Sequence, residues 1–140
     1  MKLDVSRVDV WVAGLKDRPG ALAEKLARLA DARANLEFVL ARRSPEKPAA
    51  GVVFLAPLKG PAQLKAAKAA GLRKTHSLNS VRVEGPDKPG AGAKVTRALA
   101  DAGINLRGLS AAVMKKRFVL YLAFDSPADR TKAMRVLNKM

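Results

Sequence analysis

The chain has 140 residues, of which 49% are hydrophobic and 28% charged, values typical of a folded globular protein and not of a disordered or collagen-like chain. It has no cysteine and a single histidine, His76, which excludes a disulfide framework and leaves too few ligands for a zinc or iron–sulfur site. With 27 basic and 12 acidic residues its formal net charge is +15, so it attracts polyanions whatever its fold. We expect no metal and no cofactor. Because no signal peptide or membrane span is recognisable, we also expect a cytoplasmic protein without membrane contact.

The chain repeats itself at a spacing of 70 residues. Residues 17–36, DRPGALAEKLARLADARANL, align with residues 87–106, DKPGAGAKVTRALADAGINL, and 11 of the 20 positions are identical. The repeat predicts two modules of the same design. We place the first at residues 1–72 and the second at residues 78–140, with a short basic connector at residues 73–77.

The elements of the first copy follow one another as strand, helix, hairpin and helix. A β-rich run at residues 8–15 leads into Asp-x-Pro-Gly, and leucines at helical spacing follow it. Two apolar runs, 35–43 and 50–58, flank a loop with two prolines and predict a hairpin. An alanine-rich segment at residues 61–70, opened by a proline, predicts the second helix.

The second copy repeats this order. Residues 78–84 predict its first strand, and the helix after the second Asp-x-Pro-Gly has apolar residues at Val95, Leu99 and Ala102. Residues 105–114 and 118–125 predict a hairpin, and residues 128–138 a final helix. Each copy therefore reads βαββα.

This order folds most simply as an α+β, ferredoxin-like βαββαβ module, an antiparallel sheet with both helices on one face, whose fourth strand is brief or borrowed. In residues 51–58 and 118–124 both alternating sets of side chains are apolar, so both faces of each sheet are expected to be covered. Helices cover only one face. We therefore expect the two copies to associate and the protein to form a homodimer through sheet or strand faces.

The repeated turn carries the chemistry. Asp17 and Asp87 are expected to cap the helix that follows, while Gly20 and Gly90 leave its first N–H groups bare. Bare N–H groups at the positive end of a helix bind carboxylates. Since an asparagine opening the second strand of each copy offers an oxygen to an ammonium group, the combination suits an α-amino acid.

The strand, the D-x-P-G-A turn and the helix ending in A-D-A-x-x-N-L resemble the ACT domain, a small regulatory module that binds amino acids, and the resemblance covers nearly the whole chain twice. It implies a βαββαβ fold, modules paired through strands or sheets, and an amino-acid ligand at module or subunit interfaces. It also implies an allosteric role towards an enzyme partner. The ligand-binding residues carried over are Asp17, Gly20, Ala21, Leu22, Asn35 and Leu36 in the first copy, and Asp87, Gly90, Ala91, Gly92, Asn105 and Leu106 in the second.

Two departures from repeat symmetry bear on which copy binds. Arg33-Ala34 precedes the asparagine in the first copy, where the second has Gly103-Ile104. Gly92 stands where the first copy has Leu22, which opens room and favours the second copy as the binding one. A purely structural alternative stays open for both copies, since D-x-P-G also starts helices without a ligand and asparagine is common in turns.

The rival function is nucleic-acid binding through a plait of the RNA-recognition type, driven by the charge of +15. The run Lys115 to Tyr121 faintly resembles the basic and aromatic third strand of that family, but the aliphatic Gly51–Leu55 of the first copy does not. The basic surface also suits an acidic protein partner. No nucleophile is paired with a base anywhere in the sequence, so we predict no enzymatic activity.

Overall fold

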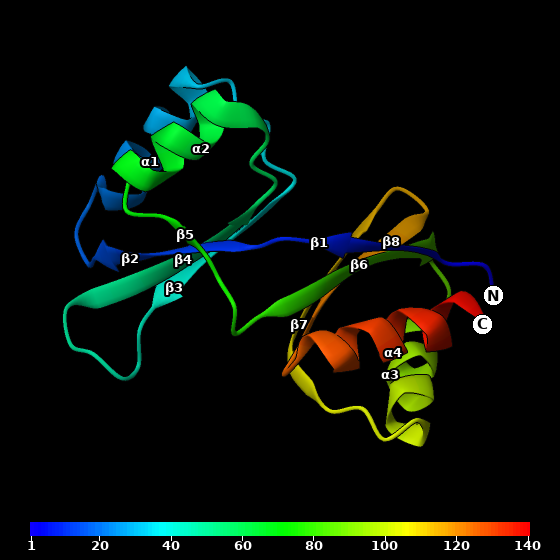
Figure 1. The fold of residues 1–140 in the computed structure, drawn as a ribbon. Coiled ribbons are helices and arrows are strands. Elements are labelled where there is room, and N and C mark those ends of the chain that lie inside the picture. The colour runs from blue at the N-terminus through cyan, green and yellow to red at the C-terminus, as the bar shows by residue number, and fades with distance from the viewer. The chain divides into compact units, whose positions relative to one another are not determined.

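The computed structural model describes residues 1–140 and divides them into two compact units (Figure 1). The N-terminal unit is Asp9–Thr75, and the C-terminal unit is His76–Met140 together with Met1–Val8. The chain thus enters the C-terminal unit, leaves it for the whole of the N-terminal unit, and returns.

The N-terminal unit is a four-stranded antiparallel sheet with two helices. Its elements are β2 (Trp11–Lys16), α1 (Ala21–Asp31), β3 (Phe38–Arg43), β4 (Ala50–Ala56), α2 (Gly60–Ala69) and β5 (Arg73–Lys74), and the sheet order is β3-β4-β2-β5. Alternate residues of the central strands, Ala13, Val53 and Leu55, are almost fully buried and pack with Leu29 of α1 and Ala67 of α2. One sheet face and one stripe of each helix form the core, as their apolar spacing predicts.

The C-terminal unit has the same architecture. Its elements are β1 (Asp4–Val8), β6 (Asn79–Pro86), α3 (Ala91–Asp101), β7 (Leu106–Met114), β8 (Arg117–Phe124) and α4 (Pro127–Asn138), in sheet order β1-β6-β8-β7. Val81, Val83, Leu122 and Phe124 are buried against Val95 of α3 and other helix residues. All four helices and both hairpins lie within a few residues of their predicted positions.

The fourth strand of each sheet is the main departure from a plain tandem array. In the N-terminal unit it is brief, the two residues Arg73–Lys74 of β5, and these lie inside the predicted connector. In the C-terminal unit it is borrowed, because β1 pairs antiparallel with β6 from Asp4 opposite Glu84 to Val8 opposite Ser80. Residues 1–8 therefore fold with the second module rather than with the first, to which the sequence analysis assigns them.

The predicted first strand, residues 8–15, is accordingly divided between two sheets. β1 ends at Val8 and β2 begins at Trp11. Between them Val10 is buried and Asp9 forms an ion pair of 3.2 Å with Lys74 of β5. A continuous β-rich run can supply strands to two sheets in succession, which is why the sequence pattern did not reveal the division.

The sheet faces opposite the helices differ between the units. In the N-terminal unit the register places Val12, Leu40, Val52 and Phe54 together on this face, and Lys16, Arg42 and Arg73 lie on the same face around them. In the C-terminal unit the same face has an ionic network, in which Arg117 contacts Asp4 at 3.0 Å and Glu84 at 2.8 Å, and Arg82 contacts Glu84 at 2.9 Å. The expectation of two apolar faces therefore fails for this sheet, because β1 and β6 contribute charged residues.

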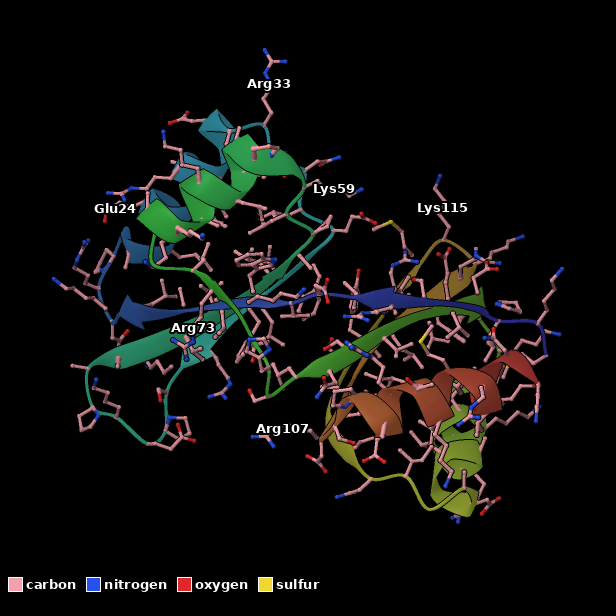
Figure 2. The ribbon with its side chains drawn as sticks, viewed as in Figure 1. Glu24, Arg33, Lys59, Arg73, Arg107 and Lys115 are labelled. Carbon is pink, nitrogen blue, oxygen red and sulfur yellow. The ribbon has the colours of Figure 1, made fainter.

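Basic side chains are distributed over both units. The N-terminal unit has 13 basic and 6 acidic residues, and the C-terminal unit has 14 and 6. Figure 2 shows Arg33, beyond the end of α1, and Lys115, in the β7–β8 turn, pointing away from the ribbon. No helix in the structure has the length and apolar character needed to span a membrane.

Candidate functional site

The two Asp-x-Pro-Gly turns have the same backbone. Gly20 and Gly90 are the residues immediately before α1 and α3, with φ of 88° and 83°, a left-handed conformation that favours glycine. The N–H of Ala21 donates to the Arg18 carbonyl at 3.4 Å, and that of Ala91 to the Lys88 carbonyl at 3.1 Å. The next two N–H groups of each helix have no acceptor in the protein, so each turn presents free donors at the positive end of a helix.

The aspartates do not cap these helices, contrary to the prediction. Neither helix has a side-chain cap, because its cap residue is a glycine, Gly20 or Gly90, and the aspartate precedes that glycine by three residues. Asp17 instead accepts from Arg43 of β3 at 3.0 Å. The exposed Asp87 contributes its backbone N–H to the Lys116 carbonyl at 2.9 Å, which ties the turn to the β7–β8 hairpin.

The N-terminal turn is covered by an ion pair. Arg18 donates to both carboxylate oxygens of Glu24, at 3.3 and 2.9 Å, and also to the Pro19 carbonyl at 3.2 Å. A Cβ built on Gly20 would lie 3.7 Å from the Arg18 guanidinium. The hydrogen bonds and charge of Arg18 lower the pKa of the Glu24 carboxyl, with Arg28 and Lys16 adding smaller attractions. We name this pair the Arg18–Glu24 clasp.

The C-terminal turn has no such cover. At the positions that correspond to Arg18 and Glu24 the second copy has Lys88 and Lys94, which repel each other and cannot pair. A Cβ built on Gly90 or on Gly92 would meet no atom within 4 Å, so the space in front of the helix is open. Ala93 and Lys94 border a broad hollow of about 750 Å³ that runs along α3 to Met140.

The predicted asparagines lie away from the turns. Asn35 and Asn105 are exposed and precede β3 and β7, while Leu36 and Leu106 are half-buried against the cores. Since β3 starts where α1 ends, each asparagine is separated from the glycine of its own unit by an 11-residue helix, or about 16 Å. One unit cannot bring its turn and its asparagine to the same small ligand.

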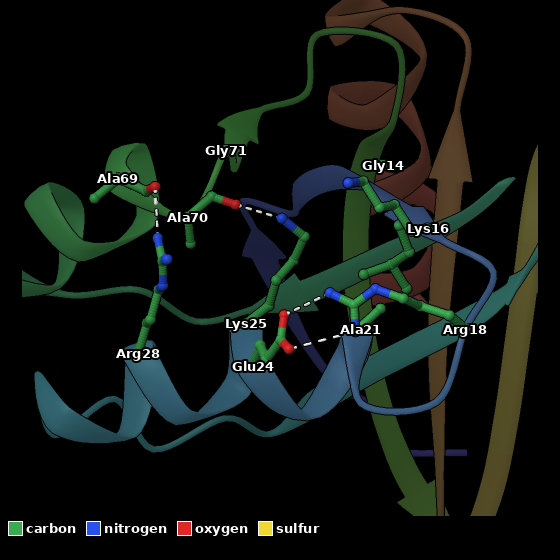
Figure 3. Close-up of a pocket in the computed structure, with 11 residues that line it drawn as sticks. Gly14, Lys16, Arg18, Ala21, Glu24, Lys25, Arg28, Ala69, Ala70 and Gly71 are labelled. Carbon is green, nitrogen blue, oxygen red and sulfur yellow. Dashed lines mark hydrogen bonds and ion pairs between the residues drawn. The ribbon is translucent and has the colours of Figure 1, made fainter.

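Two cavities adjoin the N-terminal turn. One of about 200 Å³ brings together the predicted residues Asp17, Ala21 and Leu22 with Arg42 and Arg43 of β3. The other, of about 420 Å³, lies between α1, the end of β2 and the end of α2, and contains Lys16, Lys25 and Arg28 (Figure 3). Sequence reasoning missed these three basic residues, because only the packing of α2 against α1 brings them to one place.

The sheet of the C-terminal unit is a poor surface for single-stranded nucleic acid. Arg82, Arg117 and Tyr121 lie on the face that an RNA-recognition module uses, but both arginines are already paired with Asp4 or Glu84. The hydrogen bonds from Arg117 and Arg82 lower the pKa of Glu84, so this carboxylate stays charged and opposes phosphate. No group of His, Cys, Asp and Glu side chains in the structure is arranged to hold a metal ion.

Solved structures with the same fold cover nearly the whole chain. A protein from Bacteroides thetaiotaomicron superposes with a TM-score of 0.78 at 17% identity, over 97% of this chain and 99% of that one. The ligand-free regulatory subunit of aspartate kinase from Thermus thermophilus gives 0.66 at 16% identity, over 99% and 96%. Aspartokinase alpha and beta subunits give 0.62 at 18% identity, over 99% and 96%.

At these identities the likeness establishes the fold, an α+β arrangement of two antiparallel sheets and four helices. No curated protein matches the chain in sequence. A family model does match: the ACT domain, over residues 79–140. These residues begin with β6, contain the open Gly90 turn and end with α4. The second copy of the 70-residue repeat is therefore similar in sequence to the ACT domain, and the first copy has the same order of elements.

Proposed function

We propose that the protein is a regulatory sensor that binds a small amino acid through its carboxylate at the Gly90 turn. The ACT match supports a small-molecule-binding regulatory role. We choose the Gly90 turn as the site because the space in front of it is open. The free N–H groups of Gly92 and Ala93 are the donors for the carboxylate, in line with the positive end of α3. Lys88 and Lys94 add positive charge on either side.

The ligand's ammonium group needs an acceptor, and within the Gly90 turn the exposed carboxylate of Asp87 is the side chain of opposite charge. Asn105 is too distant within the same unit, so a site that uses a turn and an asparagine draws them from different copies of the module. This reasoning favours a ligand held at a module or subunit interface, as the ACT resemblance implies. Binding there changes how strongly the copies associate, which couples the ligand to a partner enzyme.

The edge strand β7 is our candidate for self-association. It ends the sheet β1-β6-β8-β7, and its Leu109, Val113 and Met114 are 47%, 55% and 74% exposed. An open edge strand with apolar side chains pairs readily with another strand. We expect a homodimer, measured by light scattering after gel filtration, that Val113→Asp shifts to monomer.

The test of the site is calorimetric titration with the 20 common amino acids, followed by backbone amide NMR with any that bind. We expect the Gly92 and Ala93 amides to move most, and Lys94→Glu to weaken binding at least tenfold because it places a carboxylate beside the ligand's own. Lys139→Glu, the same charge change at the exposed end of α4, is the control and should have little effect. Silence from all 20 amino acids would refute the proposal.

Repeating the titration at two salt concentrations, with amino acids and with RNA, distinguishes the sensor function from nucleic-acid binding. Carboxylate binding at a helix end changes little between low and moderate salt, whereas binding to a phosphate backbone collapses. Tight, strongly salt-dependent RNA binding without any amino-acid response would favour the rival function.

A further inference from the structure

The cavity of about 420 Å³ beside α1 differs in chemistry from the Gly90 turn. All of its lining belongs to the N-terminal unit, at the end of β2, along α1 and at the α2–β5 junction. Its polar groups are four cations, Lys16, Arg18, Lys25 and Arg28, and one carboxylate, Glu24. Like charges gathered around one cavity repel one another unless an anion joins them.

The carboxylate does not neutralise this cluster. Both oxygens of Glu24 are taken by Arg18 in the clasp, at 3.3 and 2.9 Å. Lys16 and Arg28 attract Glu24 only without direct contact, and none of Lys16, Lys25 and Arg28 forms an ion pair in the structure. Three positive charges remain to be balanced.

Two of the three cations are fixed in place while keeping free donors. The Lys25 ammonium donates to the Ala70 carbonyl at 2.6 Å, and the Arg28 guanidinium donates to the Ala69 carbonyl at 3.0 Å (Figure 3). An ammonium has three N–H donors and a guanidinium five, so most of theirs stay available. These contacts also cover the carbonyls at the negative end of α2, which would otherwise repel an anion.

The second copy shows that the cluster is not a requirement of the fold. The residues that correspond to Lys16, Lys25 and Arg28 at the 70-residue spacing are Pro86, Val95 and Ala98. Val95 is fully buried in the core of the C-terminal unit, at the position where Lys25 opens onto the cavity. The module thus folds with an apolar residue there, and the N-terminal unit has a lysine instead.

We propose that this cavity binds a small dianionic metabolite, a phosphate monoester or a dicarboxylate, through Lys16, Lys25 and Arg28. Phosphate and dicarboxylate share the chemistry required, two negative charges and several acceptor oxygens within reach of fixed donors. The inference is independent of the amino-acid site at the Gly90 turn. The two units would then receive different ligands.

The experiment titrates inorganic phosphate and, separately, succinate into the intact protein at constant ionic strength, with amide NMR as the readout. We expect saturable shifts around Ala69, Ala70 and Gly71, and the tighter of the two anions identifies the ligand class. Lys25→Gln with Arg28→Gln should weaken that binding at least tenfold. The matched control, Lys65→Gln with Lys68→Gln, removes the same charge from α2 outside the cavity and should change it less than twofold.

Lys25→Val guards against misfolding of the double variant, because the module of the second copy folds with valine at this position, and it should also weaken the response. Diffuse, non-saturating shifts that both double variants reduce equally would show general attraction to a basic surface and overturn the proposal. An absent response to either anion would overturn it too. Amino-acid binding at the Gly90 turn, measured on the same variants, should be unchanged, so the two proposals fail separately.

Discussion

The two Asp-x-Pro-Gly turns share one backbone and differ in what stands in front of it. At Gly20 the Arg18–Glu24 clasp covers the helix, and at Gly90 two lysines leave it open. The residues that the repeat keeps, proline and glycine, determine the chain path and the left-handed cap. The residues in which the copies differ determine which ligand can approach, so the differences between the repeats are more informative about function than the identities.

The units also differ in their fourth strand, and this contrast predicts the largest effect. Leu3, next to the borrowed strand β1, is only 9% exposed and packs in the core of the C-terminal unit. We expect Leu3→Ala to destabilise that unit by about 2 to 3 kcal/mol and to leave the N-terminal unit unaffected. Hydrogen exchange by mass spectrometry resolves the two, and Trp11 fluorescence reports the N-terminal unit alone.

Leu55→Ala is the reciprocal control, since Leu55 is fully buried in the N-terminal unit. It should loosen that unit and shift the Trp11 signal. Equal losses of protection in both units after Leu3→Ala would show that they unfold as one cooperative body and would weaken the contrast between them.

The next largest effect is expected from exchanging the residues in front of the two turns, which tests whether these residues decide which turn binds a ligand. Lys88→Arg with Lys94→Glu installs a clasp over Gly90, and we expect amino-acid affinity to fall by more than tenfold, which corresponds to about 1.4 kcal/mol or more. Arg18→Lys with Glu24→Lys opens the Gly20 turn and should create a second, weaker site. Calorimetric stoichiometry of the two double variants measures both changes, and unchanged affinity in the first would mean that the turn is not the site.

A smaller effect on stability is expected from replacing the glycines. The backbone conformation requires glycine at positions 20 and 90 but not at position 92. Gly20→Ala and Gly90→Ala should each cost about 1 kcal/mol of unfolding free energy, because φ is positive at both. Gly92→Ala lies inside α3 with nothing within 4 Å of the added Cβ, so it should stabilise by about 0.5 kcal/mol. Chemical denaturation of the three variants checks the order, which a loss at Gly92 would contradict.

The smallest effect is the pH response of the clasp. The folded protein lowers the pKa of Glu24, so the ion pair stabilises the N-terminal unit above the ordinary carboxyl pKa and loses this contribution as the pH falls through the lowered value. Glu24→Gln should remove this part of the acid dependence and leave neutral-pH stability nearly unchanged, because the pair is exposed. The C-terminal turn, with Lys94 at the same position, should show no such step.

Local sequence patterns predicted most of the fold. The apolar spacing after each turn located α1 and α3, and the alternation in residues 118–124 located β8. The pairing of β1 with β6 could not be predicted, because a strand's partner depends on long-range register and residues 1–8 are compatible with either sheet.

The backbone of the two turns could be predicted from the sequence, whereas the surroundings of the other candidate residues could not. The glycine turns follow from their sequence, but the asparagines proved to lie a helix length away, since the motif records order along the chain and not direction in space. Asp17 does not cap the helix but accepts a hydrogen bond from Arg43, a contact that no local sequence motif predicts. The cation cluster around Lys25 arises from α2 packing on α1, a tertiary event with no signature of its own in the sequence.

The interleaved path of the chain has a consequence for how the protein is made. Residues 1–8 leave the ribosome before their partner strand β6, which begins at Asn79 and follows the entire N-terminal unit. That unit can therefore finish folding while β1 waits as an unpaired edge, and the C-terminal unit closes last. A nascent protein would pass through a stage with one completed module and one unpaired strand, a stage at which a chaperone or a second nascent chain has its best opportunity to bind.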